Sequence, residues 1–195
     1  MYDISSLIET LSKIPGIGRK SAGRIAYFLL KEKKRGYELA RVIDEVLSVT
    51  ISCEICGNYT AISPCKICSD SSRDQSVICV VEDQRDLLAI EETCSYKGVY
   101  HILSGALNPL AGITPDNLRI KELAVRLNNR DIKEVLIATN PTIDGEATFL
   151  YIQKILADYK SVKISRIATG IPMGGNLEYT DKTTLVRALA SKKYI

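Results

Sequence analysis

The chain has 195 residues, of which 46% are hydrophobic and 25% are charged. These proportions are typical of a folded globular protein and exclude a disordered chain. No apolar run reaches the roughly 18 residues that a membrane-spanning helix needs, and residues 1–5 lack the basic and apolar segments of a secretory signal. We therefore expect a cytoplasmic protein with no membrane partner.

The basic charge is concentrated near the N-terminus. Residues 13–35 contain eight Lys or Arg and one acid, a local net charge of +7, whereas the whole chain has +3. The rest of the chain is therefore slightly acidic. A concentrated basic segment is typical of a protein with a polyanionic partner such as nucleic acid, although a solvated helix face has the same composition.

Residues 1–52 have the apolar periodicity of helices. From Ile4 to Leu11 the apolar residues recur at a spacing of 3.6 residues, and Pro15-Gly16-Ile17-Gly18 then interrupts the pattern. A second helix is expected from about Arg19, and a third from Glu38 to Val49. The N-terminal region is thus predicted to be entirely helical.

The turn between the first two helices allows two specific interpretations. A phosphate-binding P-loop needs a glycine directly before its lysine, but Arg19 separates Gly18 from Lys20, so we reject it. A helix–hairpin–helix motif uses Gly16 and Gly18 to bring the backbone close to a DNA phosphate. The following helix then offers free N–H groups at its positive end. Lys20 and Arg24 lie one turn apart on one face and add formal charge.

The candidate DNA-binding residues are therefore Gly16, Gly18, Arg19, Lys20 and Arg24. Groups of this kind contact phosphates rather than bases, so binding to single- and double-stranded DNA should be sensitive to salt and independent of sequence. An ordinary turn between two helices is the alternative, and the basic charge of the segment favours DNA binding.

Residues 53–75 are short of apolar residues and contain four of the six cysteines. Two CxxC turns, eight residues apart, supply Cys53, Cys56, Cys65 and Cys68. Two such turns bring four thiolates to one tetrahedral centre, the geometry and softness that zinc prefers. An iron–sulfur cluster uses similar ligands, and simple burial of thiols is a third alternative. A closed four-sulfur shell predicts one structural Zn²⁺ per chain, which holds together a segment too small to form a core.

Residues 76–170 alternate between expected strands and helices. Residues 77–81 form a continuous apolar run, as in a strand that is buried on both faces. Further strands are expected at 99–103, 134–138 and 162–168, and helices at 86–93, 117–127 and 147–158. This alternation predicts a parallel α/β sheet with right-handed crossovers. A C-terminal tail follows, with a short helix at 182–192.

Acidic residues follow two of the predicted strands, at the edge where parallel sheets place their sites. Glu82 comes directly after the first strand, and Asp144 and Glu146 come after the third. A phosphoryl-transfer site clusters carboxylates at this edge to hold Mg²⁺. These three acids are therefore candidate functional residues.

This region resembles the Toprim domain of topoisomerases and primases, which carries a glutamate after the first strand and an Asp-x-Asp pair after the third. Glu82 matches the glutamate, whereas Asn140 and Thr142 fall where the two aspartates belong. Neutral side chains hold Mg²⁺ far less well than carboxylates. The resemblance implies the fold, while the missing aspartates predict a protein that has no catalytic residues and is not an enzyme. A Mg²⁺-dependent nuclease or nicking enzyme is the alternative.

Along its whole length the chain resembles the RecR family of bacterial recombination mediators. The match includes Pro-Gly-Ile-Gly-x-Lys-Ser-Ala at 15–22, the paired CxxC turns, and Gly-Ile-Pro-Met-Gly-Gly-Asn-Leu-Glu-Tyr at 170–179. The resemblance implies a non-enzymatic, DNA-binding mediator of recombinational DNA repair. It also implies a homo-oligomeric ring, a tetramer, that clamps DNA and acts with RecO and RecF to help load RecA on single-stranded DNA.

The resemblance also assigns roles to residues and parts of the chain. Lys20 and Arg24 match DNA-binding positions of the family, and the acidic Toprim face that the family uses toward its partners includes Glu82, Asp144 and Glu146. The fold class is multidomain, α and α/β. Its expected parts are a helix–hairpin–helix domain at 1–52, a four-cysteine zinc finger at 53–75, a Toprim domain at 76–170 and a C-terminal oligomerisation tail at 171–195.

Overall fold

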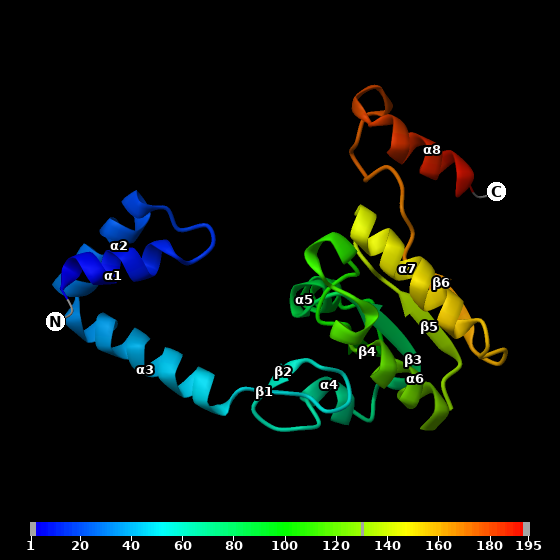
Figure 1. The fold of residues 1–195 in the computed structure, drawn as a ribbon, viewed down its shortest axis with the longest axis horizontal. Helices are drawn as coiled ribbons and strands as arrows, with labels where there is room; N and C mark the ends of the chain where they lie inside the picture. Colours follow the sequence, from blue (N-terminus) through cyan, green and yellow to red (C-terminus); the bar gives the residue numbers. More distant parts are fainter. Residues whose placement is uncertain (1–2, 130, 193–195) are drawn as a thin grey trace. The chain divides into compact units, whose positions relative to one another are not determined.

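The computed structural model describes residues 3–129 and 131–192. The chain divides into two separately packed units, residues 1–50 and 51–195 (Figure 1). Within the described residues, no helix combines the length and the apolar character needed to cross a bilayer. The cysteine segment, the sheet and the tail therefore belong to one unit. The division of the chain into four parts, at 1–52, 53–75, 76–170 and 171–195, stays a prediction.

The first unit consists of three helices, as predicted. They are α1 (Ile4–Ser12), α2 (Arg19–Lys31) and α3 (Lys33–Val49). Asp3 caps α1, because its carboxylate accepts a hydrogen bond from Ser6 N at 2.9 Å and the Ser6 hydroxyl accepts one from Asp3 N. The third helix begins five residues earlier than predicted. Only Glu32, with a ψ of 62°, interrupts the helical backbone between α2 and α3.

The apolar face of α3 is open to solvent. Leu39, Val42, Ile43 and Val46 lie on this face and are between 43% and 52% exposed. No residue of α3 is buried. A contiguous row of exposed apolar side chains is typical of a surface that another protein covers.

The second unit contains a four-stranded sheet in which all strands are parallel, as predicted. The strands are β3 (Asp74–Val81), β4 (Gly98–Ile102), β5 (Glu134–Ile137) and β6 (Lys163–Arg166), in the order β4-β3-β5-β6. The helices of this region are α5 (Gln84–Glu92), α6 (Ile120–Asn129) and α7 (Ile143–Leu156). Along the chain, β4 is added on one side of β3, whereas β5 and β6 are added on the other side. The carboxyl ends of β3 and β5 therefore form the switch point where open α/β sheets place their sites.

Alternate residues of β3 contribute to two apolar clusters. Ile78 and Val80 belong to a cluster that includes buried residues of α6 and α7. Cys79 and Val81 belong to a second cluster, which includes Leu87 of α5. All four strand residues are 0% exposed. The strand is thus buried on both faces, as its continuous apolar run predicts.

All three helices beside the sheet begin elsewhere than predicted, and α5 starts at Gln84, two residues early. The first turn of α7 starts at Ile143, four residues early, because the Thr142 hydroxyl accepts a hydrogen bond from Gly145 N at 3.0 Å and caps the helix. The start of α6 lies three residues late, because Pro115–Asn117 forms a separate 3-10 turn, η2. The early start of α7 places Asp144 and Glu146 in its first turn.

The cysteine segment packs on the edge of the sheet. It contains a short hairpin, β1 (Ile51–Ser52) with β2 (Tyr59–Thr60), and the single-turn helix α4 (Lys66–Ser69). Ile102 N, at the end of β4, donates a hydrogen bond to Cys56 O at 2.8 Å. Gln84 Nε2, at the start of α5, donates to Gly57 O at 3.2 Å.

Candidate functional site

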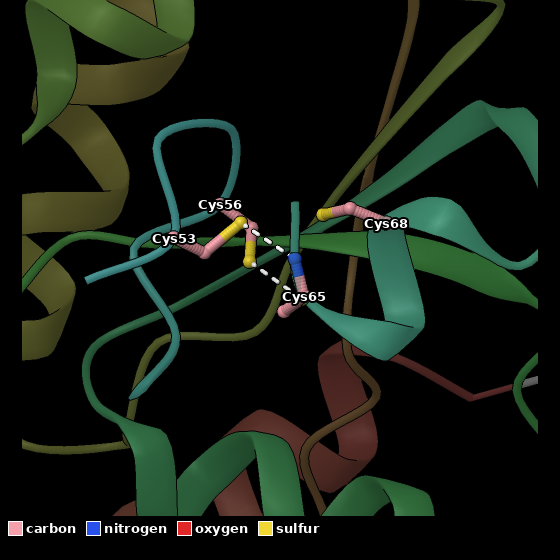
Figure 2. Close-up of side chains that lie close together, drawn as sticks. All are labelled: Cys53, Cys56, Cys65 and Cys68. Atoms are coloured by element: carbon pink, nitrogen blue, oxygen red, sulfur yellow. Dashed lines mark hydrogen bonds between the residues drawn. The ribbon is translucent and has the colours of Figure 1, made fainter. Parts of the chain in front are cut away.

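The four cysteines of residues 53–75 lie together, as their spacing predicts. Their Sγ atoms are all within 4.8 Å of one another, and all four residues are buried. Figure 2 shows their side chains turned toward one another from two separate turns of the chain. Cys56 Sγ and Cys65 Sγ are 3.6 Å apart. Tetrahedral zinc–thiolate bonds separate two sulfurs by about 3.8 Å, so the cluster has the dimensions of a site that can hold a metal ion.

The surroundings of the cluster shift the pKa values of its thiols in both directions. Asn58 N donates to Cys56 Sγ, and Cys65 N donates to Cys53 Sγ, both at 3.4 Å. A hydrogen bond from Cys68 lowers the pKa of Cys56 to about 5, whereas burial raises the pKa of Cys65 to about 11. Burial thus opposes the accumulation of negative charge. A bound cation would remove that opposition and allow all four sulfurs to act as ligands.

Gly57, directly after the first CxxC turn, allows a close approach between this turn and the side chain of Arg119. Its φ is +83°, and a Cβ at this position would lie 1.9 Å from Arg119 Nη1. The same guanidinium donates from Nη2 to Glu54 O at 3.4 Å. The sequence indicates the turn at Gly57, but it contains no signal for Arg119, which lies far along the chain.

The five DNA-binding candidates lie in the hairpin between α1 and α2 and in the first two turns of α2. Gly16 has a φ of +84°, and nothing lies within 4 Å of a Cβ added at Gly16 or Gly18. No side chain caps the N-terminus of α2. Arg19, Lys20 and Arg24 are exposed, and none of them forms an ion pair with an acid of the described chain. The positive charge of this end of α2 is therefore not neutralised internally.

Glu82 and Asn140 meet at the switch point of the sheet. Asn140 N donates to Glu82 Oε1 at 2.8 Å, and Asn140 Nδ2 donates to Glu82 Oε2 at 2.8 Å. Asp86 of α5, which was not among the residues expected from the sequence, lies 3.4 Å from the same Nδ2. The sequence does contain a local pattern that involves Asp86, since it stands three residues after Asp83, the spacing of a capping box. In the structure these two residues form the capping box of α5.

The other two acidic candidates have different partners. Asp144 Oδ2 accepts a hydrogen bond from Asn108 Nδ2 at 2.8 Å. Glu146 accepts from Arg166 Nη1 and Nη2 at 3.0 and 2.6 Å and lies 3.4 Å from Arg187 Nη2. These hydrogen bonds with Arg166 hold the pKa of Glu146 below its usual range. The three acids thus have separate partners, and among the described residues they do not form a group that could hold a metal ion.

Arg187 connects the tail to α7 through Glu146. The tail contains η3 (Leu177–Tyr179) and α8 (Lys182–Ala190), and residues 193–195 of the predicted tail lie outside the described residues. A cleft of about 970 Å³ is lined by the carboxyl edge of the sheet, the first turn of α7 and α8, including Asn140, Glu146 and Arg187. Leu177, Tyr179 and Leu189 are 63%, 82% and 69% exposed. These three apolar side chains are exposed, whereas Leu185, which was expected to be exposed with them, is partly buried.

Three family models match the chain. A model of the Toprim domain matches residues 76–168, a model described as "RecR, helix-hairpin-helix" matches residues 4–47, and one described as "RecR, C-terminal" matches residues 170–193. The order of these matches is the order of the parts expected from the sequence.

Similar proteins match over nearly their full length. A protein named "Recombination protein RecR" from Moorella thermoacetica is 48% identical over 190 residues, which cover 97% of this chain and 95% of that protein. A protein of the same name from Heliobacterium modesticaldum is 47% identical over 191 residues, covering 97% and 96%. A third, from Saccharopolyspora erythraea, is 44% identical over 198 residues and covers both chains completely. The chain therefore belongs to the RecR family.

Proposed function

We propose that this protein is a non-enzymatic, DNA-binding mediator of recombinational DNA repair. The observation that carries the proposal is the exposed N-terminus of α2, where Arg19, Lys20 and Arg24 have no acidic partner in the described chain. Gly16 and Gly18 leave the backbone open beside these charges. The site would bind phosphates of single- and double-stranded DNA without reading the sequence.

The metal of the cysteine cluster is proposed to be one structural Zn²⁺. Four buried sulfurs at tetrahedral spacing match the preference of zinc and leave no position for a substrate. When bound, Zn²⁺ would neutralise the thiolates and hold the two CxxC turns together. Because the first turn also contacts β4 and α5, the ion would fix this segment against the sheet.

A role other than catalysis is proposed for the acidic edge of the sheet. The loop that would supply paired aspartates carries Asn140, whose amide donates to Glu82. Glu82, Asp144 and Glu146 are proposed to face protein partners, which the family resemblance gives as RecO and RecF, during the loading of RecA on single-stranded DNA. Of the three, Glu146 is already paired with two arginines, so it is the one whose charge is least available to a partner.

The proposed assembly is a homo-oligomeric ring, a tetramer, that clamps DNA. The exposed apolar face of α3 and the exposed apolar side chains of the tail support contacts between copies of this chain. Light scattering of the full chain tests the assembly. A strictly monomeric mass at micromolar concentration would contradict it.

The DNA-binding role is tested by Lys20→Glu combined with Arg24→Glu. We expect the double variant to bind labelled DNA weakly and to lower the slope of log affinity against log salt by about 2 for duplex DNA. Lys154→Glu combined with Lys160→Glu is a matched control, because both lysines are exposed and the change in charge is the same. Equal affinities of the two double variants would overturn the assignment to α2.

The remaining catalytic alternative is a Mg²⁺-dependent nuclease or nicking enzyme. A cleavage assay with supercoiled and single-stranded DNA in Mg²⁺ or Mn²⁺ separates it from the mediator. Metal-dependent cutting that Glu82→Gln abolishes would refute the non-enzymatic proposal, whereas intact DNA at high protein concentration supports it.

A further inference from the structure

An aromatic side chain lies in the middle of the basic face of α2. Lys20, Arg24, Tyr27 and Lys31 follow one another at intervals of three or four residues, which places them on one side of the helix. They line a shallow hollow of about 620 Å³, together with Arg19, Gly23 and Phe28. No acidic residue lies within α2. The face is therefore positively charged on both sides of an aromatic ring.

Tyr27 has no structural partner that explains its place on this face. Its side chain is 65% exposed, and within the described residues it makes no hydrogen bond, ring contact or cation–π contact. The neighbouring Phe28 differs, because the guanidinium of Arg35 lies 5.7 Å from the centre of its ring. An exposed aromatic ring without an internal partner is available to a ligand with a flat apolar surface.

Gly23 lies one turn before Tyr27 and leaves space beside it. Glycine destabilises the interior of a helix relative to alanine. Here the local packing does not require it, because nothing lies within 4 Å of a Cβ added at Gly23. Because Gly23 has no side chain, the hollow is deeper between the side chains of Lys20 and Tyr27. This space would admit a planar group against the ring.

We propose that Tyr27 stacks on an unpaired base of single-stranded DNA while Lys20, Arg24 and Lys31 contact the adjacent phosphates. The inference rests on the proposed DNA-binding role of α2 and extends it from the phosphates to the bases. Aromatic rings stack on every base, so the contact tolerates any sequence. Bases of a duplex are already stacked and paired, so the contact is specific for the single strand.

The most direct test uses Tyr27→Trp in the full chain. The natural sequence has no tryptophan, so the variant carries one fluorophore at the proposed contact. We expect oligo(dT) to quench it and an abasic oligonucleotide of equal length to leave it unquenched. Tyr37→Trp is a matched control, because Tyr37 is 77% exposed and lies on α3. Equal responses of the two variants, or equal quenching by both oligonucleotides, would overturn the proposal.

Affinities separate stacking from phosphate binding. We expect Tyr27→Ala to weaken binding to oligo(dT) by about 5- to 100-fold, with affinities for the abasic strand and for duplex DNA unchanged. Tyr27→Phe should retain the wild-type preference for oligo(dT), since the ring is kept. Loss of affinity for all three ligands in Tyr27→Ala, or a reduced molar mass by light scattering, would assign Tyr27 to an interface between copies instead.

Gly23→Ala gives a second, independent readout. The added methyl group should raise the thermal stability of the chain, because it favours the helix, and still reduce affinity for oligo(dT) relative to the abasic strand. Higher stability with an unchanged ratio of affinities would contradict a ligand in the hollow. If Lys20→Glu with Arg24→Glu leaves DNA affinity intact, the proposed function itself fails; if that variant weakens binding and Tyr27→Ala does not, only the stacking contact fails.

Discussion

Asn140 donates hydrogen bonds to both carboxylate oxygens of Glu82, from its backbone N–H and from its side-chain amide, at 2.8 Å each. The residue lies at the position of an aspartate in the Toprim resemblance. A carboxylate there would join Glu82 in holding a divalent cation, whereas the amide satisfies Glu82 without one. The contact also fixes the loop before α7. Glycine is needed at position 145, because a Cβ on Gly145 would lie 2.0 Å from Asn140 O.

The first prediction is that Asn140→Asp converts this contact into a cation site. Without metal, two carboxylates would face each other, and we expect the free energy of unfolding to fall by about 1–3 kcal/mol. Mn²⁺ should restore stability and bind more tightly than to wild type, as measured by thermal unfolding and by electron paramagnetic resonance. Asn128→Asp, at an exposed position of α6, controls for the charge. A Mn²⁺ response equal to that of the control would contradict the prediction.

The second prediction concerns Glu146, which joins α7 to β6 and α8. Glu146→Gln should lower the free energy of unfolding at pH 7 by about 1–2 kcal/mol, because Arg166 and Arg187 lose their charged acceptor. Urea unfolding followed by circular dichroism measures this difference. Glu9→Gln is the matched control, since the Glu9–Lys13 pair is 72% exposed on both sides and should contribute almost nothing.

The same pair predicts a dependence on pH. The hydrogen bonds from Arg166 lower the pKa of Glu146 in the folded protein. The carboxylate therefore stabilises the fold above its unfolded pKa of roughly 4.3, and this contribution is lost as the pH falls through the lower folded pKa. The difference between wild type and Glu146→Gln should be complete at neutral pH and should shrink below about pH 4. A difference that stays constant to acid pH would contradict the ion pair.

The third prediction is that the cysteine cluster binds a metal ion and that this ion stabilises the fold of residues 53–75. Cys56→Ser should lower the metal content below one ion per chain and reduce the folded yield, since metal ligation stabilises segments of this kind by ~10 kcal/mol. Elemental analysis and thermal unfolding with and without a chelator measure both effects. Cys94→Ser is the control, because Cys94 is exposed and lies outside the cluster. Full metal content in Cys56→Ser would refute the assignment.

The fourth prediction isolates the approach of Arg119 to Gly57. Gly57 and Gly112 both have a positive φ, +83° and +76°, but a Cβ at Gly112 would meet nothing within 4 Å. Gly112→Ala should therefore cost only the backbone strain, about 1–2 kcal/mol. Gly57→Ala should cost roughly 1 kcal/mol more, because the Arg119 side chain, only 18% exposed, must move.

A double variant tests the cause of that difference. Adding Arg119→Ala to Gly57→Ala should cost less than the sum of the two single changes, since the clash is then absent. Thermal unfolding of the four proteins gives the comparison. Additive effects would show that Arg119 does not limit the side chain at position 57.

Local patterns in the sequence determined most of the fold. The apolar run at 77–81 specifies a strand buried on both faces, and the alternation of strands with helices specifies a parallel sheet. The spacing of two CxxC turns predicts the four-sulfur cluster, because each turn presents two thiolates over a short stretch of chain. The predicted boundaries were wrong where a cap decides them, as at Thr142, whose hydroxyl starts α7 before its apolar pattern begins.

Tertiary structure alone decided which residues meet. Asn140 lies 58 positions from Glu82 in the sequence, and Arg187 lies 41 positions from Glu146. Partners of this kind depend on strand order and on the register of side chains at the sheet edge, which no local pattern encodes. The sequence therefore established the elements, the cysteine cluster and the basic hairpin. The three-dimensional packing established that the acids at the sheet edge are held by different donors, since a charged group in a partly buried site must find its own partner.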